Sequence, residues 1–279
     1  MNPASIIPTI TALARAGAAV QAWRLFDAHG LAGADDPAAQ ALHGRLLKDK
    51  ALAATGAERR ALAAQAAAAY LASARLRPAT YPLVNAATLA LIAGDAAGAA
   101  VMAGEVLALM EVAPEPDTPW WQAATRAEAL LLMVDEAGAR AALADAMALA
   151  PLAWEDHAVT LRQFATIIAE QGGDAAWLEP LRPPRSLHFT GAMRLGEAEP
   201  ALAARIDAII AAENIGFGFG ALAAGADLLV AERLLAAGAE LHIVLPGGEA
   251  AFRARSVTPF GARRQQALGH QQVGPGGQR

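Results

Sequence analysis

A glycine-rich stretch late in the chain holds the residue types best suited to binding chemistry. Glycines alternate over residues 216–220, and Gly-Ala-Asp follows at residues 225–227. Glycines at the end of a strand leave backbone N–H groups accessible to a phosphate, and the positive end of the next helix dipole attracts the same anion. The stretch therefore predicts a site for a nucleotide-like ligand, formed by Gly218, Phe219, Gly220, Gly225 and Asp227. The alternative is that the glycines serve only tight packing of a helix on a strand.

This stretch lacks two marks of the common nucleotide sites. Its glycines do not follow the GxGxxG spacing, and no Walker-type lysine accompanies them. Asp227 would hydrogen-bond a ribose or base, or it would only cap the helix that follows.

No other set of residues forms a pattern that indicates catalysis or metal binding. The six histidines are scattered without metal-ligand spacing. His188 and His242 fall on strands that we expect to be neighbours, but the alternation of side chains along a strand leaves open whether they share a face. Acidic pairs occur at turns and expected helix starts, where they stabilise the helix dipole. The sequence favours a protein that is not an enzyme, without catalytic residues or a bound metal.

Tryptophan and arginine residues are the candidates for contact with a partner. Trp120 and Trp121 begin an expected helix, and tryptophan is enriched at binding hot spots. Arg75 and Arg77 lie at a helix end, where they would attract an acidic partner. The alternative readings are packing between helices for the tryptophans and a solvated surface for the arginines.

These candidates must be positioned by a largely helical scaffold. The chain has 279 residues, of which 77 are alanine, the strongest helix former, and it has no cysteine. This composition excludes an all-β fold, a disordered chain and disulfides. The net charge of −5 gives no general attraction to nucleic acid or to an anionic membrane. Residues 85–110 are apolar enough to imitate a membrane span, but Gly94-Asp95 divides them into two short helices.

Helical segments separated by Gly, Pro and Asp fill the first 180 residues. In the clearest unit, residues 120–133 form one helix, Asp135 opens a turn, and a second helix ends before Pro151. With Trp120 as position 1, small residues fall at Ala127, Ala139 and Ala146. This arrangement resembles the 34-residue tetratricopeptide repeat (TPR). Weaker units are expected at residues 79–112, 38–78 and 10–29, and a last helix at residues 154–171. The alternative is a helical bundle without repeats.

The pattern changes after residues 181–184, Leu-Arg-Pro-Pro. Strands are expected at residues 186–190, 215–220 and 241–245, with helices at 200–213 and 222–237 between them. Strand–helix–strand order with short links predicts a parallel, right-handed α/β unit. Three strands form an incomplete sheet compared with the five or six of a doubly wound fold. Residues 262–279 are rich in Gln and Gly and are predicted to be disordered.

Specific residues resemble two families. Residues 81–88, Tyr-Pro-Leu-Val-Asn-Ala-Ala-Thr, with Gly94-Asp95 and the repeat at Trp120, resemble the TRAFs-binding helical region of apoptosis-signal-regulating-type kinases and bacterial TPR proteins. Residues 185–191 and 218–227 look like the α/β module that follows the repeats in the bacterial members. Residues 220–227 are also similar to the SLOG superfamily. That resemblance implies a Rossmann-like domain that binds nucleotides or nucleotide-derived ligands.

The resemblance to SLOG enzymes is incomplete. Residues 245–249, Leu-Pro-Gly-Gly-Glu, begin like the PGGxGTxxE motif of SLOG phosphoribohydrolases, but the Gly-Thr pair and the later glutamate are missing. A simple turn is expected there. The family's sheet also continues beyond the equivalent of Val257, whereas this chain departs into Thr258-Pro259-Phe260.

Together these features predict a TPR-like helical repeat domain over residues 1–180, a partial Rossmann-like (SLOG-like) α/β module over 181–261, and a disordered tail over 262–279. The expected function is a cytoplasmic, protein-interaction scaffold of a bacterial signalling system. Its concave repeat surface would bind a protein or peptide, and its α/β module would sense a nucleotide-like ligand. We expect no nucleic acid and no membrane partner, and a homo-oligomer could form through the exposed sheet edge. The alternatives are a SLOG-type nucleotide-processing enzyme and an inactive truncated fragment.

Overall fold

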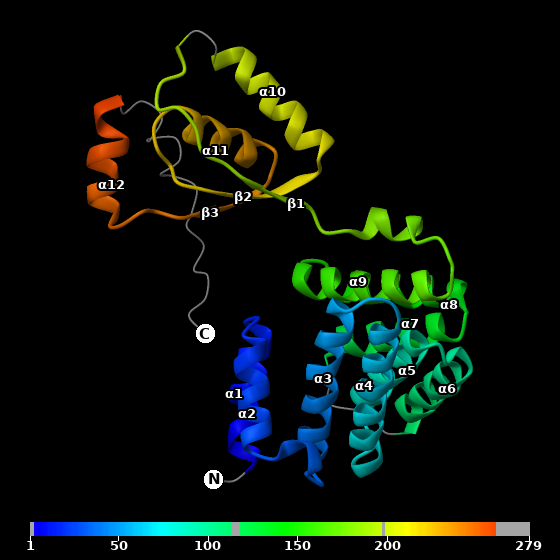
Figure 1. Ribbon diagram of the computed structural model, residues 1–279. Coiled ribbons are helices and arrows are strands. Elements are labelled where there is room, and N and C mark those ends of the chain that lie inside the picture. Colours follow the sequence, from blue (N-terminus) through cyan, green and yellow to red (C-terminus); the bar gives the residue numbers. More distant parts are fainter. Residues whose placement is uncertain (1–2, 113–117, 197–198, 261–279) are drawn as a thin grey trace. The chain divides into compact units, whose positions relative to one another are not determined.

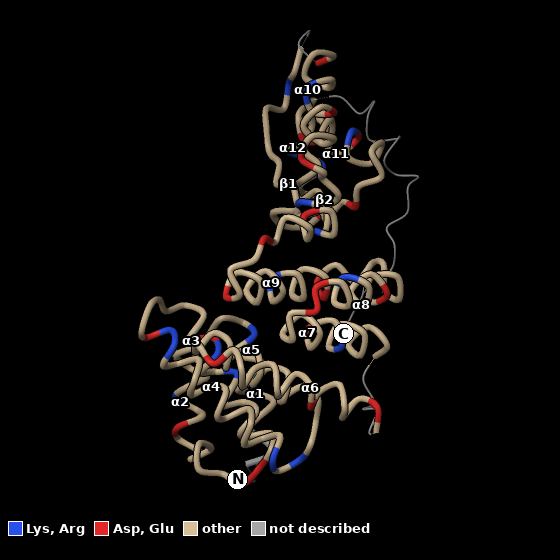
Figure 2. Tube along the Cα trace, turned by 90° about the vertical axis from the view of Figure 1, so that its right-hand side faces the viewer, with Lys and Arg blue, Asp and Glu red and all other residues tan. Residues whose placement is uncertain are grey.

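The computed structural model describes residues 3–112, 118–196 and 199–260, and these divide into two compact units (Figure 1). One unit ends at Arg182 and the other begins at Pro183. The tail predicted over residues 262–279 lies outside the described residues. Charged residues are sparse along the trace (Figure 2), as the charged fraction of 18% requires.

The first unit consists of helices arranged mostly as antiparallel hairpins. The successive pairs α1–α2, α3–α4, α5–α6 and α7–α8 are followed by the single helix α9. Their bounds are α1 Pro3–Arg15, α2 Ala19–Ala28, α3 Pro37–Ala53, α4 Gly56–Leu76, α5 Thr80–Ala93, α6 Ala96–Val112, α7 Pro119–Leu132, α8 Glu136–Leu149 and α9 Trp154–Glu170. The expected hairpins and the expected last helix are thus confirmed.

Local sequence signals set the ends of these helices. The Asp36 side chain accepts a hydrogen bond from the Ala39 N–H and caps α3, whose first residue is Pro37. Asp135 caps α8 in the same way through the Gly138 N–H. Gly94 ends α5 in the left-handed conformation, with φ of 99°. This break divides the apolar run of residues 85–110, and no helix among the described residues is long and apolar enough to cross a membrane.

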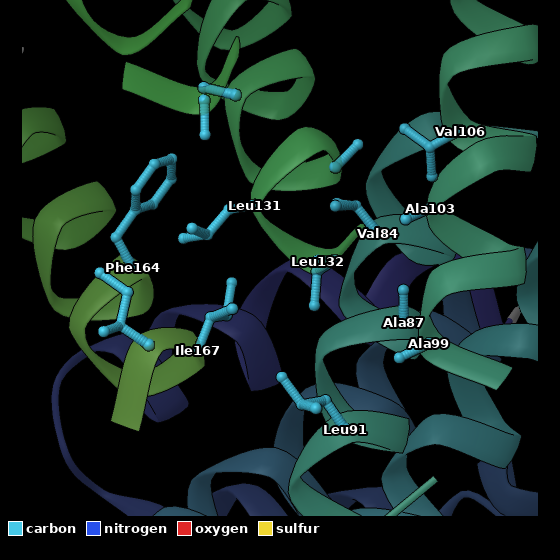
Figure 3. Packing of buried hydrophobic residues seen from close by; sticks show 14 of the residues in the cluster. Val84, Ala87, Leu91, Ala99, Ala103, Val106, Leu131, Leu132, Phe164 and Ile167 are labelled. Atoms are coloured by element: carbon cyan, nitrogen blue, oxygen red, sulfur yellow. The ribbon is translucent and has the colours of Figure 1, made fainter. Parts of the chain in front are cut away.

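Small residues allow the hairpins to pack closely. The alanines predicted at repeat contact positions, Ala127, Ala139 and Ala146, are all fully buried, and so is Ala86 of α5. The largest core cluster joins α5, α6, α7, α8 and α9, and Figure 3 shows side chains from these helices converging on it. A second cluster joins α3, α4 and α5, and a third joins α1, α2 and α3. The core is therefore continuous from one hairpin to the next, as in a repeat stack.

The second unit is a small α/β structure with a three-stranded parallel sheet in the order β1-β2-β3. Helices α10 and α11 lie on the same side of the sheet (Figure 1) and cover it with Ile206, Ile210, Leu229 and Leu234. The bounds are β1 Arg185–His188, α10 Glu199–Ala212, β2 Ile215–Gly220, α11 Ala226–Ala236, β3 Glu240–Ile243 and α12 Glu249–Ser256.

Two sequence-based boundaries in this unit need correction. Helix α11 begins at Ala226, not at Leu222, because Gly225 has a φ of 81° and the Ala224 N–H donates to the Ser256 carbonyl outside the helix. The residues after Gly248 form helix α12, where only a turn was expected. Val257, which follows α12, is almost fully buried, so this helix is anchored at its end.

Candidate functional site

A groove of about 710 Å³ lies in the helical unit, between the first helices of three successive hairpins. Helix α1 contributes Ile7, Thr11 and Arg15, and α3 contributes Leu42 and Arg45. Arg77 ends α4, and Tyr81 and Pro82 begin α5. The remaining lining residues are Pro37, Ala38, Ala41, Ser73, Pro78 and Ala79. Volumes of 300–1,000 Å³ are typical of binding sites.

The groove is lined by cations and lacks acidic residues. Arg15, Arg45 and Arg77 line it, and none of its described lining residues is Asp or Glu. The Arg45 Nε is buried and has no hydrogen-bond partner among the described residues. Asp49, one turn further along α3, forms no ion pair with Arg45 in the described part of the chain. Burial raises the pKa of the Asp49 carboxyl, and Arg45 and Lys48 oppose this shift. The groove is thus a positively charged surface in an acidic protein.

The wall formed by α3, α4 and α5 is held by specific contacts. The Ser73 hydroxyl donates to the Pro37 carbonyl, 2.8 Å away, and fixes the end of α4 against the start of α3. The Tyr70 and Tyr81 hydroxyls are 3.4 Å apart, and their rings meet edge to face. Burial, followed by the neighbouring Tyr81, raises the pKa of Tyr70 well above its ordinary range. These contacts connect α3, α4 and α5 on this side of the groove.

A polar cluster outside the groove lining connects α3, α5, α7 and α9. Lys48 of α3 donates to Asn85 Oδ1 of α5 at 2.9 Å and to Gln163 Oε1 of α9 at 3.3 Å. Glu128 of α7 accepts from Thr88 Oγ1 at 2.7 Å and from Gln163 Nε2 at 3.0 Å. Burial lowers the pKa of Lys48, and the Glu128 carboxylate opposes this shift. Because its donors and acceptors satisfy one another, this cluster is a structural connection.

The glycines predicted to bind a ligand lie against protein atoms in the α/β unit. A β-carbon added to Gly218 would collide with Leu234 of α11 and come within 2.8 Å of Leu241 Cδ2. At Gly220 it would lie 2.5 Å from Phe189 Cε2, and at Gly225 it would collide with the Ala192 carbonyl. These contacts fit the packing alternative for the three glycines. They leave the ligand-binding role of the stretch a prediction.

Asp227 is placed at the N-terminal end of α11 with its carboxyl buried, at 4% exposure. Burial raises the pKa of this carboxyl, and hydrogen bonds from the Ala223 and Gly191 backbone N–H groups oppose the shift. Its Oδ1 atom is buried without a partner among the described residues. Asp227 therefore ties the loop after β1 to α11 and keeps one free acceptor atom.

Phe219 lies at the centre of a stack of three rings on the sheet. His188 stacks on it at 5.0 Å between ring centroids and His242 at 4.5 Å, with interplanar angles of 13° and 8°. The strand register pairs His188 with Phe219 and Phe219 with His242, so all three side chains share one face. This answers the question that the sequence left open for the two histidines. No group of three or more metal-ligating side chains occurs in the described part of the chain.

Comparison with known protein families gives a match within the helical unit. A family model described as Tetratricopeptide Repeats-Sensor matches residues 8–90. Over these residues the helical unit is similar to tetratricopeptide repeats. No curated protein and no solved structure matches the chain. The match supports neither the TRAFs-binding nor the SLOG resemblance, but it spans every lining residue of the groove except Ile7.

The predicted partner-binding residues of this tetratricopeptide-type unit separate into two groups. Trp120 is 3% exposed and stacks on His157 of α9 at 4.6 Å, so it packs α7 against α9. Trp121 is 39% exposed, and Arg75 is also exposed. Arg77 is the one predicted partner residue that the structure brings to the groove. A contact role for Trp121, Arg75 and Arg77 stays a prediction.

Sequence reasoning missed Arg15, Arg45 and Tyr81 as groove residues. Arg15 and Arg45 occupy the first helices of consecutive hairpins, and Arg77 and Tyr81 flank the turn into the next hairpin. A search for basic residues on the first helix of each hairpin would have found the two arginines. The first two repeats matched the repeat pattern too weakly to give their register.

Proposed function

We propose that this protein is a scaffold of a signalling system and that its tetratricopeptide-type unit binds a protein partner in the groove between α1, α3 and α5. The observation that carries this proposal is the groove itself, open to solvent and lined by a buried Arg45 Nε without a partner. Stacked helical hairpins present extended surfaces of this kind to protein partners.

A site-specific photo-crosslinker tests this function in cells. Ala38 is exposed and lines the groove, so a benzophenone side chain placed there would capture a segment bound in it. Ala64 of α4 is also exposed and does not belong to the groove, so it is the matched control position. We expect a discrete crosslinked protein from position 38 and none from position 64. Equal crosslinking patterns at both positions would contradict the proposal.

A blocking variant makes the same test independent of the crosslinker. Ala38→Trp would fill part of the groove, whereas Ala64→Trp adds the same ring elsewhere on the unit. We expect Ala38→Trp to abolish recovery of the partner identified by crosslinking, with unchanged helical content by circular dichroism. Recovery of that partner by both variants would place its binding site outside the groove.

For the α/β unit we propose a sensor role toward a nucleotide-like ligand. The observation in its favour is Asp227 near the N-terminus of α11, whose buried Oδ1 has no hydrogen-bond partner among the described residues. Calorimetry of the full chain against a nucleotide panel tests it, with Asp227→Asn as the variant. Binding that Asp227→Asn weakens would support the sensor. Turnover of the nucleotide would favour the enzyme alternative, and absence of binding would reject both.

A further inference from the structure

We propose that the groove between α1, α3 and α5 recognises an acidic segment of its protein partner, in which Asp or Glu side chains pair with Arg15, Arg45 and Arg77. This inference rests on the proposed function, since it specifies the chemistry of the partner that the groove would hold. The three guanidinium groups are the charged side chains of the groove among its described lining residues.

The distribution of the arginines favours an extended segment with several carboxylates. Arg15 ends α1, Arg45 lies within α3, and Arg77 follows α4, so the three cations come from three separate elements around the groove. A segment with several carboxylates can offer one acceptor group to each of these three side chains.

Arg45 provides the most specific contact. Its Nε is buried without a hydrogen-bond partner, and its guanidinium forms no ion pair among the described residues. Asp49 lies close enough for Arg45 to oppose the burial-induced rise in the pKa of its carboxyl, but the two side chains do not form an ion pair. A guanidinium presents a planar pair of donors that matches a carboxylate in two parallel hydrogen bonds. A carboxylate at Arg45 would therefore give a charged acceptor to a guanidinium that has no ion pair among the described residues.

The apolar lining strengthens this pairing. Ile7, Leu42 and Pro82 line the same groove as the arginines. When a segment covers these side chains, water leaves the groove and the attraction between opposite charges grows, because the local dielectric constant falls. The preferred segment consequently alternates acidic with apolar residues.

Fluorescence anisotropy with synthetic probes tests the inference on the full chain. The probe is a short fluorescein-labelled peptide that alternates Glu with Leu and Ala, and its matched control carries Gln in place of each Glu. We expect the Glu peptide to bind at least about tenfold more tightly than the Gln peptide, because a charge-assisted hydrogen bond contributes about one tenfold step or more. We also expect its affinity to fall as salt is added.

Arginine variants assign the effect to the groove. Arg45→Gln and Arg77→Gln should each weaken binding of the Glu peptide about tenfold. Arg75→Gln removes the same charge two residues before Arg77, outside the groove, and should change the affinity less than about twofold. Arg77 is exposed, so its variant remains informative if Arg45→Gln lowers the stability of the fold.

The possible outcomes separate this inference from the proposed function. Equal affinity for the Glu and Gln peptides, or equal losses in Arg45→Gln and Arg75→Gln, would overturn the acidic partner. A probe with phosphoserine in place of Glu that binds when the Glu peptide does not would identify a phosphate-binding groove instead. If position 38 crosslinks a partner in cells but the Glu peptide does not bind, the scaffold function stands and the acidic specificity fails. If the Glu peptide binds in an arginine-dependent way but position 38 crosslinks no partner, the acidic specificity stands and the scaffold function fails.

Discussion

Gly44 of α3 lies beneath the ring of Tyr70 of α4, so close that a β-carbon on the glycine would come within 2.6 Å of Tyr70 Cδ2. The hydroxyl of Tyr70 lies 3.4 Å from that of Tyr81, and Tyr81 lines the groove between α1, α3 and α5. The absence of a side chain at residue 44 therefore determines where a wall of the groove stands. Glycine lowers helix stability relative to alanine, so its place inside a helix here is explained by this contact.

Gly44→Ala should lower the free energy of unfolding of the helical unit by about 1–3 kcal/mol, because overpacking against a buried ring exceeds the gain in helix propensity. The matched control is Gly104→Ala in α6, where a β-carbon would meet no atom within 4 Å. That change should raise stability by about 0.5–1 kcal/mol. Urea denaturation of both variants measures the difference. Similar effects from the two substitutions would mean that the Tyr70 contact does not explain the glycine.

Trp120 and Trp121 should differ in their effects when each is replaced by alanine. Trp120→Ala removes a ring that is buried against His157, and a loss of about 3–5 kcal/mol is expected for such a truncation. Trp121 is 39% exposed, so Trp121→Ala should change stability by less than about 1 kcal/mol. Thermal unfolding of the two variants tests this. If partner binding decreases in Trp121→Ala at unchanged stability, the predicted contact role of Trp121 is supported.

Gly220 and Phe189 should show strong coupling in a double-mutant cycle. Gly220→Ala places a β-carbon against the Phe189 ring, so it should destabilise the α/β unit by about 1–3 kcal/mol. Phe189→Leu should remove part of this cost, since a smaller side chain leaves room for the added methyl group. Hydrogen exchange of β2 amides provides the measurement. Additive effects of the two substitutions would show that the ring does not constrain this glycine.

Asp227 should make the free energy of unfolding of the α/β unit rise as the pH falls, which a neutral residue at this position would not do. Burial raises the pKa of its carboxyl in the folded state above the ordinary value of 3.8, so the folded state binds the proton more readily than the unfolded state. As pH falls from the folded pKa to 3.8, this group contributes a gain in the free energy of unfolding, and the gain is complete below 3.8. Asp227→Asn should lack this contribution, which the difference between the two pH profiles isolates. A carboxyl titration by NMR with a midpoint at or below 3.8 would contradict the prediction.

The sequence predicted hairpins well because their boundaries carry local signals. Gly94-Asp95, Asp135 and Pro151 act within a few residues of the helix ends that they determine. Local signals failed at residues 221–224, where alanines favour a helix but Gly225 and the hydrogen bond to Ser256 keep the backbone out of one. Helix α12 was not predicted. None of its residues is buried, so its sequence has no apolar face to mark it as an amphipathic helix.

The groove could not be predicted because it depends on contacts distant in sequence. Arg15, Arg45 and Arg77 come together only when three hairpins stack, and the small contacts that set this stacking, such as Gly44 beneath Tyr70, carry no local pattern. The face shared by His188 and His242 likewise depended on strand register, because a shift of one residue would turn each side chain to the opposite face.

The division of the chain at Arg182 and Pro183 also separates its intrinsic fluorophores. All five tryptophans, at positions 23, 120, 121, 154 and 177, precede that boundary, so tryptophan emission reports on the helical unit alone. Far-ultraviolet circular dichroism reports on both units, since each contains helices. A single denaturant titration followed by both signals would therefore resolve whether the α/β unit unfolds together with the helical repeats or on its own.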